Sequence, residues 1–290
     1  MLSKRAFLAR SAALAAGGLL APQLAFAQNV QEAVNQRVRQ MRAQGLLAAD
    51  EKTAWQVTDL RARRSVVSLN ANASLQAASM VKPLVIQAYL MCHYHKDPVL
   101  YPLSPRVMNE MREMIVTSNN EFTNHIIKRL GGPQGVQWML KKEAPHIFRD
   151  IHIVEYIPEG GRTYQNRASA ADYDRFLQAL WSRSLPGAEQ LLAMMAIPNN
   201  DRIRTKTRFV PQSASVFDKT GSTAMLCGNT GIIECRDAAG NRYPYTFTGI
   251  IEKQRKVDNY ASWITSRSNR MREISDLVYQ HFSRAYRLIG

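Results

Sequence analysis

Ser79-Met80-Val81-Lys82 stands at the start of a predicted helix, and two further short motifs follow it along the chain. These are Ser118-Asn119-Asn120, between two predicted helices, and Lys219-Thr220-Gly221, on a predicted strand edge. Each motif alone is weak evidence, because such short patterns arise by chance in a chain of this length. Their joint occurrence, in this order and in these contexts, indicates that three distant segments build one site.

The first two motifs contain the residue types that serine acyl transfer requires. On a helix, Lys82 lies one turn after Ser79 on the same face, so its amine can take the hydroxyl proton. A lysine does this at neutral pH only if burial or a nearby cation lowers its pKa. We therefore expect a desolvated Lys82 close to Lys219. Asn120 is suited to hold the amine, and Ser118 to carry a proton to the leaving nitrogen.

The third motif supplies groups that bind the substrate. Lys219 and Thr220 suit a substrate carboxylate. Gly221 has no side chain, which lets a substrate lie against the strand and pair with its backbone. We expect the backbone amides of Ser79 and Ser222 to bind the oxyanion, because preorganised donors stabilise the charge that develops there.

Together the motifs resemble those of the class A β-lactamase family, penicillin-recognising serine hydrolases whose signatures are S-x-x-K, S-D-N and K-T-G. Residues 104–132, 217–252 and 260–282 also read like stretches of that family. The resemblance implies an α/β (α+β) fold of the β-lactamase/transpeptidase type and an acyl-enzyme mechanism that needs no cofactor. It also implies a monomer that acts on a small β-lactam or a cell-wall peptide.

The resemblance is incomplete where the family places the glutamate that activates the deacylating water. The family's E-x-x-L-N pattern is absent, and residues 151–169 read IHIVEYIPEGGRTYQNRAS. Glu155 fits better by its distance along the chain from Ser118 and Lys219, and Glu159 is the alternative. Asn166 is the candidate for the amide that holds the water. Both glutamates could instead be solvated loop residues, since Glu is rarely buried.

Two further departures concern the substrate cleft. Asn119 replaces the aspartate of the S-D-N motif, while the two outer residues of the motif are kept. Many relatives carry an arginine on the strand after K-T-G, where it binds the substrate carboxylate, but Asn229-Thr230-Gly231 stands there in this chain. The resemblance therefore implies a modest affinity for ordinary penicillins.

Hydrophobic spacing predicts a helix over residues 30–41 and an apolar stripe, Met271, Ile274, Val278 and Phe282, on a last helix, which the resemblance extends over residues 260–282. Strand patterns cover residues 54–60, 65–69, 215–217, 231–235 and 245–251. We therefore predict one discontinuous domain, residues 28–75 and 205–290, in which an antiparallel sheet is flanked by the N- and C-terminal helices. An all-helical domain, residues 76–204, interrupts it, and the catalytic groups meet at the seam.

Residues 1–27 resemble a cleavable export signal. Lys4, Arg5 and Arg10 give a positive start, the small and apolar run Ser11 to Leu20 follows, and Ala25-Phe26-Ala27 is a small-x-small cleavage site. Either the twin-arginine or the ordinary secretory route fits this pattern, so we expect a periplasmic or secreted protein. No later segment is long and apolar enough to anchor the chain in a membrane.

The chain of 290 residues is strongly basic, with 38 Lys and Arg against 23 Asp and Glu. A nucleic-acid-binding protein is the obvious alternative for such a charge. However, the basic residues are scattered, and no zinc-finger spacing or RNA-binding aromatic motif accompanies them. The densest group, Arg61-Ala62-Arg63-Arg64, falls at an expected hairpin turn. We therefore expect no nucleic-acid partner and attribute the charge to solubility and attraction to anionic surfaces or substrates.

The chain has three cysteines, an odd number for an exported protein. Cys92 falls in an apolar helix and is expected to be buried. Cys227 and Cys235 flank an expected turn, so a disulfide between them is an open alternative. His93-Tyr94-His95 stands apart from other ligand types at metal-site spacing, so no metal is expected.

Three functions are compatible with these observations. The first is an exported serine hydrolase that opens β-lactam rings through an acyl-Ser79 ester, with Glu155 or Glu159 activating the water. The second is a D-Ala-D-Ala peptidase or related hydrolase of cell-wall peptides with slow deacylation, which the missing glutamate pattern favours. The third is a non-catalytic binding protein, in which the serine, lysine and K-T-G set would have no obvious use.

Overall fold

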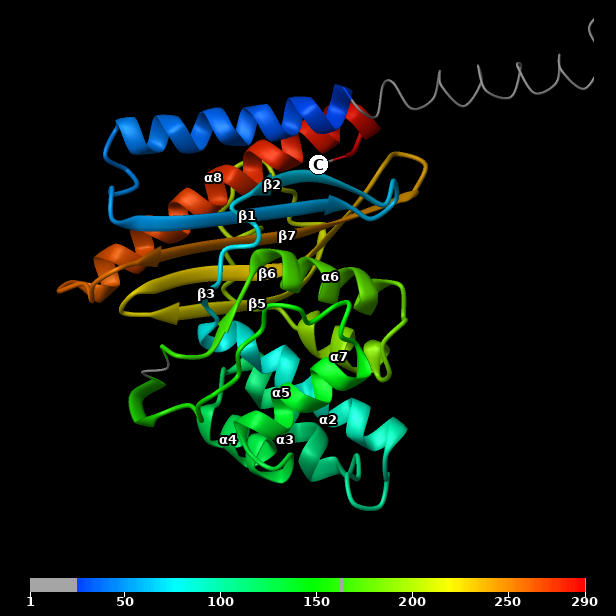
Figure 1. Cartoon of the computed structure of the whole chain (residues 1–290). Coiled ribbons are helices and arrows are strands. Elements are labelled where there is room, and N and C mark those ends of the chain that lie inside the picture. The colour runs from blue at the N-terminus through cyan, green and yellow to red at the C-terminus, as the bar shows by residue number, and fades with distance from the viewer. Residues whose placement is uncertain (1–24, 162–163, 290) are drawn as a thin grey trace, which may run out of the picture.

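The computed structural model describes residues 25–161 and 164–289. A five-stranded antiparallel sheet in the order β2-β1-β7-β6-β5 forms the centre of the molecule (Figure 1). A short two-stranded pair, β3 with β4, lies outside it. The strands are β1 (Glu51–Asp59), β2 (Arg64–Leu69), β3 (Leu75–Gln76), β4 (Arg167–Ala168), β5 (Ser215–Thr223), β6 (Leu226–Arg236) and β7 (Arg242–Lys253).

Helices cover both faces of this sheet (Figure 1). The N-terminal helix, residues 25–43 of the described chain, lies beside α8 (Tyr260–Tyr286) on one face. The other face carries the segment between β3 and β5, which confirms the expected fold class. That segment contains η1 (Ala78–Met80), α2 (Val81–His95), α3 (Pro105–Val116), α4 (Asn120–Arg129), α5 (Pro133–Glu143), η2 (Glu159–Gly161), α6 (Ala170–Trp181) and α7 (Ala188–Met195).

The apolar side chains form two clusters, one on each side of the sheet. Val34, Trp55 and Phe282 belong to the cluster beneath the two terminal helices. Leu84 and Phe176 belong to the cluster among the inserted helices. Burial of each such side chain stabilises the fold by about 1.5–3 kcal/mol. Because the sheet covers one side of each cluster, the helices on both faces depend on it for this stabilisation.

The strands of the sheet are longer than their sequence pattern predicted. β5 continues through the K-T-G motif to Thr223, and β6 contains Gly228 and Gly231, which have low strand propensity. Close packing explains both glycines. A Cβ at Gly228 would lie 2.5 Å from Met80 Cε, and one at Gly231 would lie 2.6 Å from Asp218 Cβ. Tertiary contacts therefore decide the strand where local propensity opposes it.

The cysteine expectation was wrong in one respect. Cys227 and Cys235 do not flank a turn, because both lie on β6. Eight residues of extended strand separate their Cα atoms by about 26 Å, far beyond the reach of a disulfide. All three cysteines are buried free thiols. Burial, assisted by Glu234, raises the pKa of Cys235 to about 12, so this thiol stays protonated.

The export-signal prediction falls mainly on residues 1–24, which lie outside the described residues. From residue 25 onward the chain is already helical, and the Phe26 ring packs edge-on against Phe282 with 5.3 Å between the ring centres. Cleavage after Ala27 would remove this contact. Within the described part of the chain, no helix has both the length and the apolar character needed to cross a membrane.

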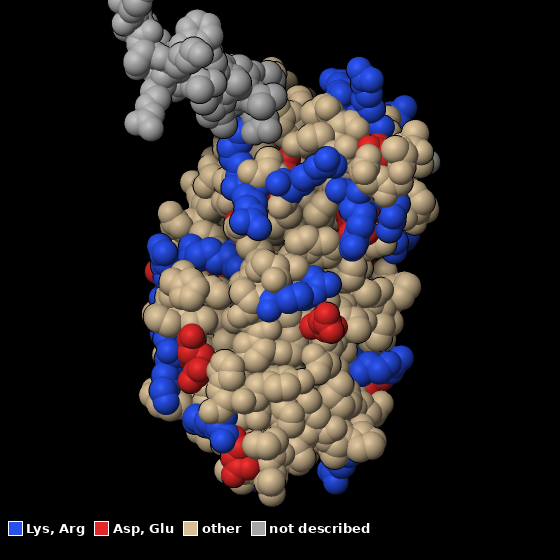
Figure 2. Space-filling view, turned by 90° about the vertical axis from the view of Figure 1, so that its right-hand side faces the viewer, with Lys and Arg blue, Asp and Glu red and all other residues tan. Residues whose placement is uncertain are grey.

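On the face shown in Figure 2, basic residues are spread out rather than gathered in a single patch. Figure 2 shows Lys and Arg side chains across one whole face, more densely over its upper part, with Asp and Glu between them. The arginine-rich segment forms the expected turn between β1 and β2. There Asp59 Oδ1 accepts hydrogen bonds from the amides of Arg61 and Ala62, both at 2.9 Å. The Arg61 guanidinium also lies 4.4 Å from the centre of the Tyr243 ring.

Candidate active site

Ser79 lies in η1, at the point where β5 approaches the start of α2. A Cβ at Gly221 would lie 3.2 Å from Ala78 Cβ and 3.0 Å from Met80 Cγ. The glycine of the K-T-G motif is therefore needed for the packing of β5 against this turn, a different reason from the substrate contact that the sequence suggested. Ala78 itself has a φ of 44°, an unfavourable backbone conformation for a residue with a side chain.

The second motif approaches the same turn from the start of α4. Asn119 caps this helix, since its side chain accepts a hydrogen bond from the Phe122 amide at 2.9 Å. Ser118 has a left-handed φ of 59°, and its carbonyl accepts a hydrogen bond from Lys82 Nζ at 2.5 Å. The middle residue of the motif thus has a structural task, which Asn and Asp perform equally well at a helix N-terminus.

Lys82 is buried at the centre of the site. Its Nζ lies 3.2 Å from Ser79 Oγ, 3.0 Å from Ser118 Oγ and 2.8 Å from Asn120 Oδ1. The two hydroxyl oxygens are themselves 2.9 Å apart. Burial, together with the charge of Lys219, lowers the pKa of Lys82 to about 7. The amine can therefore be neutral near physiological pH, as a proton acceptor must be.

Lys219 is the second buried amine of the site and lies on β5. Burial lowers its pKa to about 8, and Arg202 adds to the effect while Asp218 opposes it. The amine donates a hydrogen bond to the Thr220 carbonyl at 3.2 Å. At neutral pH Lys219 is mostly charged, so it can attract an anionic substrate group. Thr220 and Ser222 follow it on the strand and are only partly buried.

Arg202 is a residue of this region that motif reading missed. Its side chain is 7% exposed and extends beneath the end of β5. The guanidinium donates hydrogen bonds to the carbonyls of Gly221 and Gly228, at 3.1 and 2.5 Å, and to Ser222 Oγ at 2.5 Å. A cation therefore supports this strand end although the expected strand arginine is absent. No motif spacing pointed to Arg202, because its contacts with Gly221 and Gly228 join segments that lie 19 and 26 residues apart in the chain and meet only in the folded structure.

The residue at the expected arginine position, Asn229, is part of a buried polar network. Its Nδ2 donates to Asp218 Oδ2 and its Oδ1 accepts from the Arg202 amide, both at 2.8 Å. Asn199 donates a further hydrogen bond to Asp218 at 2.8 Å. Burial, with help from the charge of Asp201, raises the pKa of Asp218 to about 6. These contacts hold β5 and β6 in register where Thr220 pairs with Asn229.

The loop between α5 and α6 carries the candidates for the deacylating base. Glu155 Oε1 accepts hydrogen bonds from the backbone amides of Tyr164 and Gln165, at 2.8 and 2.9 Å. Asn166 is buried, and its Oδ1 accepts from the Glu155 amide at 3.1 Å. Both side chains therefore organise the backbone of this loop. Glu159 begins η2 and is exposed to solvent.

The turn that contains Glu159 lies close to Asn120 of the second motif. A Cβ at Gly161 would lie 3.2 Å from Asn120 Nδ2. Asn124 fixes the preceding segment by hydrogen bonds with both the amide and the carbonyl of Ile157, each at 2.8 Å. Of the two candidate glutamates, Glu159 is the one closer in the chain to this contact. Among the described residues, no group of three or more His, Cys, Asp or Glu side chains could hold a metal ion.

A family model described as the beta-lactamase enzyme family matches residues 92–282, well over half of the chain. The matched stretch includes Ser118 and the Lys219-Thr220-Gly221 motif, whereas Ser79 and Lys82 precede it. A search of curated proteins found no match.

Several solved structures share the fold at low sequence identity. A point mutant of PBP-A, an acyl-enzyme complex with penicillin G, is 17% identical with a TM-score of 0.65, over 90% of this chain and 97% of that one. A β-lactamase from Desulfarculus baarsii DSM 2075 is 17% identical with a TM-score of 0.68, over 86% and 97%. The TLA-1 extended-spectrum β-lactamase is 13% identical with a TM-score of 0.69, over 88% and 98%. By its family match, the chain belongs to the beta-lactamase enzyme family and is a serine hydrolase.

Proposed function

We propose that this chain is an exported hydrolase that opens β-lactam rings through an ester on Ser79. The observation that carries the proposal is the buried Lys82 amine, which lies 3.2 Å from Ser79 Oγ and has a pKa of about 7. A neutral amine at this distance can accept the hydroxyl proton at the moment of attack. Export is the part of the proposal that rests on residues 1–27.

In the proposed acylation step, protons move between the side chains of Ser79, Lys82 and Ser118 while the lactam ring opens. Ser79 Oγ attacks the lactam carbonyl carbon, a C–O bond forms, and the ring C–N bond breaks. Lys82 takes the Ser79 proton and returns it to Ser118 Oγ, which lies 3.0 Å from the amine, while Ser118 gives its own hydroxyl proton to the ring nitrogen. In this proposal the amides of Ser79 and Ser222 bind the oxyanion, since backbone donors fixed in advance need no reorganisation.

The substrate carboxylate would bind at the end of β5. Lys219 supplies a cation there, and Thr220 and Ser222 supply hydroxyl groups on a partly buried strand face. Arg202 donates to Ser222 Oγ at 2.5 Å and adds positive charge from below the strand. Its hydrogen bonds to protein oxygens favour an indirect role, in which it orients the serine hydroxyl toward the substrate.

Deacylation requires a water molecule and a base, and Glu155 or Glu159 is the proposed base. Two observations favour a second candidate function, a peptidase of cell-wall D-Ala-D-Ala peptides whose acyl-enzyme decays slowly. Glu155 Oε1 is occupied by the amides of Tyr164 and Gln165. Within the described residues, no carboxylate accepts a hydrogen bond from Lys82. Both functions share the acylation step and differ in how long the ester persists.

One experiment tests both candidates. The purified protein is mixed with benzylpenicillin, and intact-mass spectra follow the adduct while absorbance follows hydrolysis of a chromogenic cephalosporin. We expect one penicillin bound per chain, with rapid loss of the adduct and accumulation of product. In Ser79→Ala neither adduct nor turnover should appear, whereas Ser215→Ala, at an exposed serine of β5, should behave as wild type.

The outcomes separate the candidates clearly. An adduct that persists for many minutes without turnover favours the peptidase. Absence of both adduct and turnover in the wild-type protein would rule out acyl transfer on Ser79 from β-lactams.

The acylation rate should depend on pH through the two buried lysines. Below about pH 7 the Lys82 amine is protonated and cannot accept the Ser79 proton, so the rate should rise as pH increases through this value. Above about pH 8 Lys219 loses its charge, so the rate should fall again. Because the amines interact, the two apparent pKa values belong to the pair.

The measurement is the second-order acylation rate constant between pH 5 and 10, which reports the free enzyme. The Lys219→Arg variant is the matched control. Its guanidinium stays charged over this range, so the falling limb should disappear while the rising limb stays near pH 7. A flat profile between pH 6 and 9 in the wild-type protein would show that Lys82 is not the base.

A further inference from the structure

A cavity of about 460 Å³ lies beside the candidate active site, between η2 and the end of β5. Gly160 and Gly161 line one side, and Ser222 lines the other. The Gly161 backbone also approaches Asn120, since a Cβ there would lie 3.2 Å from Asn120 Nδ2. The inner end of the cavity is therefore formed by residues that adjoin the proposed catalytic groups.

The geometry of acylation indicates which part of a substrate would enter this cavity. Ser118 marks the side of the leaving nitrogen, because its hydroxyl is the proposed proton donor. The acyl side chain is attached to the other side of the carbonyl carbon and extends away from that nitrogen. Asn120, Gly161 and Ser222 border the space that remains on this side.

Two tyrosines and a lysine form the outer wall of the cavity. Tyr164, Lys256 and Tyr260 all line it. Lys256 Nζ lies 5.2 Å from the centre of the Tyr164 ring, within the range of a cation–π contact. The segment that carries Lys256 is attached to the β5–β6 turn, because the Val257 amide donates to the Ala224 carbonyl at 3.0 Å. The Tyr164 ring and the Lys256 ammonium group therefore lie next to each other in the outer wall of the cavity.

The wall is aromatic and positively charged. Of the described residues that line the cavity, Lys256 alone carries a charge. Its side chain is exposed, and no ion pair joins it to another described residue. Glu159 and Asp258 are acidic neighbours in the chain, but neither lines the cavity. Aromatic rings beside an unpaired ammonium group fit a ligand group that is both apolar and anionic.

We propose that this cavity receives the acyl side chain of the substrate and that Lys256 makes it selective for side chains bearing a carboxylate beside an aromatic or apolar group. The inference rests on the proposed acylation of Ser79 and adds a substrate preference to it. Tyr164 and Tyr260 offer apolar surface to the ring, and the Lys256 ammonium pairs with the carboxylate. Lys256 is thus a specificity-determining residue.

Two penicillins that differ by a single carboxylate test this proposal. Benzylpenicillin and α-carboxybenzylpenicillin share the bicyclic nucleus and the phenyl group, so the ratio of their acylation rate constants isolates the extra charge. In Lys256→Gln we expect the relative rate of the carboxylated compound to fall about two- to fivefold, the range for one partly solvated ion pair. The rate constant for benzylpenicillin should stay within a factor of about two, because its acyl side chain has no carboxylate that could form an ion pair with Lys256.

Two further variants control for charge and for the surrounding segment. Lys256→Arg keeps the cation and should preserve the ratio. Arg255→Gln removes an adjacent exposed cation that does not line the cavity, and it should also preserve the ratio. In the wild-type protein, salt at about 0.5 M should reduce the preference by screening the pair, and in Lys256→Gln it should have little effect.

Failure of this inference is distinguishable from failure of the proposed function. If the wild-type protein is acylated by neither penicillin, the acyl-transfer proposal itself is wrong. If both penicillins acylate it and Lys256→Gln leaves their ratio unchanged, only the role of Lys256 is overturned. An equal fall in Arg255→Gln would also overturn it, because the preference would then come from the overall charge of the segment.

Discussion

In the Lys82→Met variant, acylation by benzylpenicillin should slow by about 10²–10⁴-fold, the range for loss of a general base. Methionine occupies a similar volume but has no amine, so nothing at this position can take the Ser79 proton. The Ser118 carbonyl and Asn120 Oδ1 also lose their donor. The rate of adduct formation in intact-mass spectra measures the effect.

Lys128→Met is the matched control for this substitution, because Lys128 is an exposed lysine of α4. It should acylate at the wild-type rate. Thermal unfolding of both variants verifies that the fold is retained. If Lys82→Met acylated within about tenfold of the wild-type rate, below the range for a general base, another group would have to deprotonate Ser79, and the proposed mechanism would fail.

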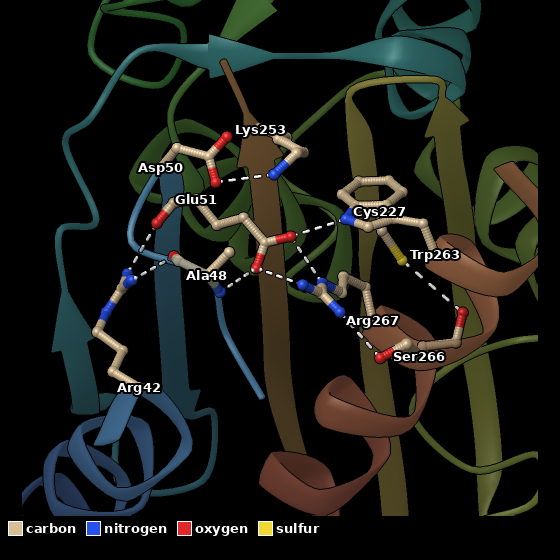
Figure 3. A network of polar contacts seen from close by, with 10 residues as sticks. Arg42, Ala48, Asp50, Glu51, Cys227, Lys253, Trp263, Ser266 and Arg267 are labelled. Carbon is tan, nitrogen blue, oxygen red and sulfur yellow. Dashed lines mark hydrogen bonds and ion pairs between the residues drawn. The ribbon is translucent and has the colours of Figure 1, made fainter. Parts of the chain in front are cut away.

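The Glu51→Gln variant should lose about 3 kcal/mol of unfolding free energy, because it breaks a buried ion pair. Glu51 is 2% exposed at the start of β1 (Figure 3). Its carboxylate accepts hydrogen bonds from Arg267 at 2.7 and 2.8 Å, from Trp263 Nε1 at 2.7 Å and from the Ala48 amide at 2.8 Å. Glutamine keeps the shape but leaves the Arg267 charge unpaired in a largely buried position, which typically costs about 3–5 kcal/mol. The value expected here is at the low end, because the glutamine oxygen still accepts.

Asp50→Asn, at the neighbouring residue, is the control for this effect. Asp50 pairs with Lys253 at 2.8 Å, but the two side chains are 38% and 22% exposed (Figure 3). Such solvated pairs contribute about 0–1 kcal/mol, so this variant should stay close to the wild-type stability. Equilibrium denaturant unfolding measures both variants. A loss below about 1 kcal/mol in Glu51→Gln would indicate that Arg267 finds another partner.

Local sequence predicted the two terminal helices and the helical character of the inserted segment better than the lengths of the strands. Ser104 and Asn119 begin α3 and α4 as capping residues, and the capping residue of a helix acts on neighbours only three positions away. β6 was predicted only from Gly231 onward, because Gly228 and Asn229 disfavour a strand. Pairing with β5 and β7 and contact with Met80 extend it to Leu226.

In the candidate site too, some contacts follow from local sequence and others only from the tertiary structure. Residues 79 and 82 are one helical turn apart, so their proximity follows from local geometry, and the structure places Ser79 Oγ and Lys82 Nζ 3.2 Å from each other. The tasks of Glu155 and Asn166 could not be predicted in this way. Their hydrogen bonds depend on how the whole loop folds back on itself, and the loop lacks a periodic pattern.

The amino-acid sequence by itself determined the terminal helices, the helical insertion between strand-rich ends and the three motifs of a serine hydrolase. Helical and strand patterns can be recognised locally because they reflect interactions between near neighbours. Only the tertiary structure decided that Arg202 lies beneath β5, that Gly221 packs against the Ser79 turn and that Lys256 faces Tyr164. These contacts join segments far apart in the chain. Their positions follow from the packing of the whole molecule, which no local pattern encodes.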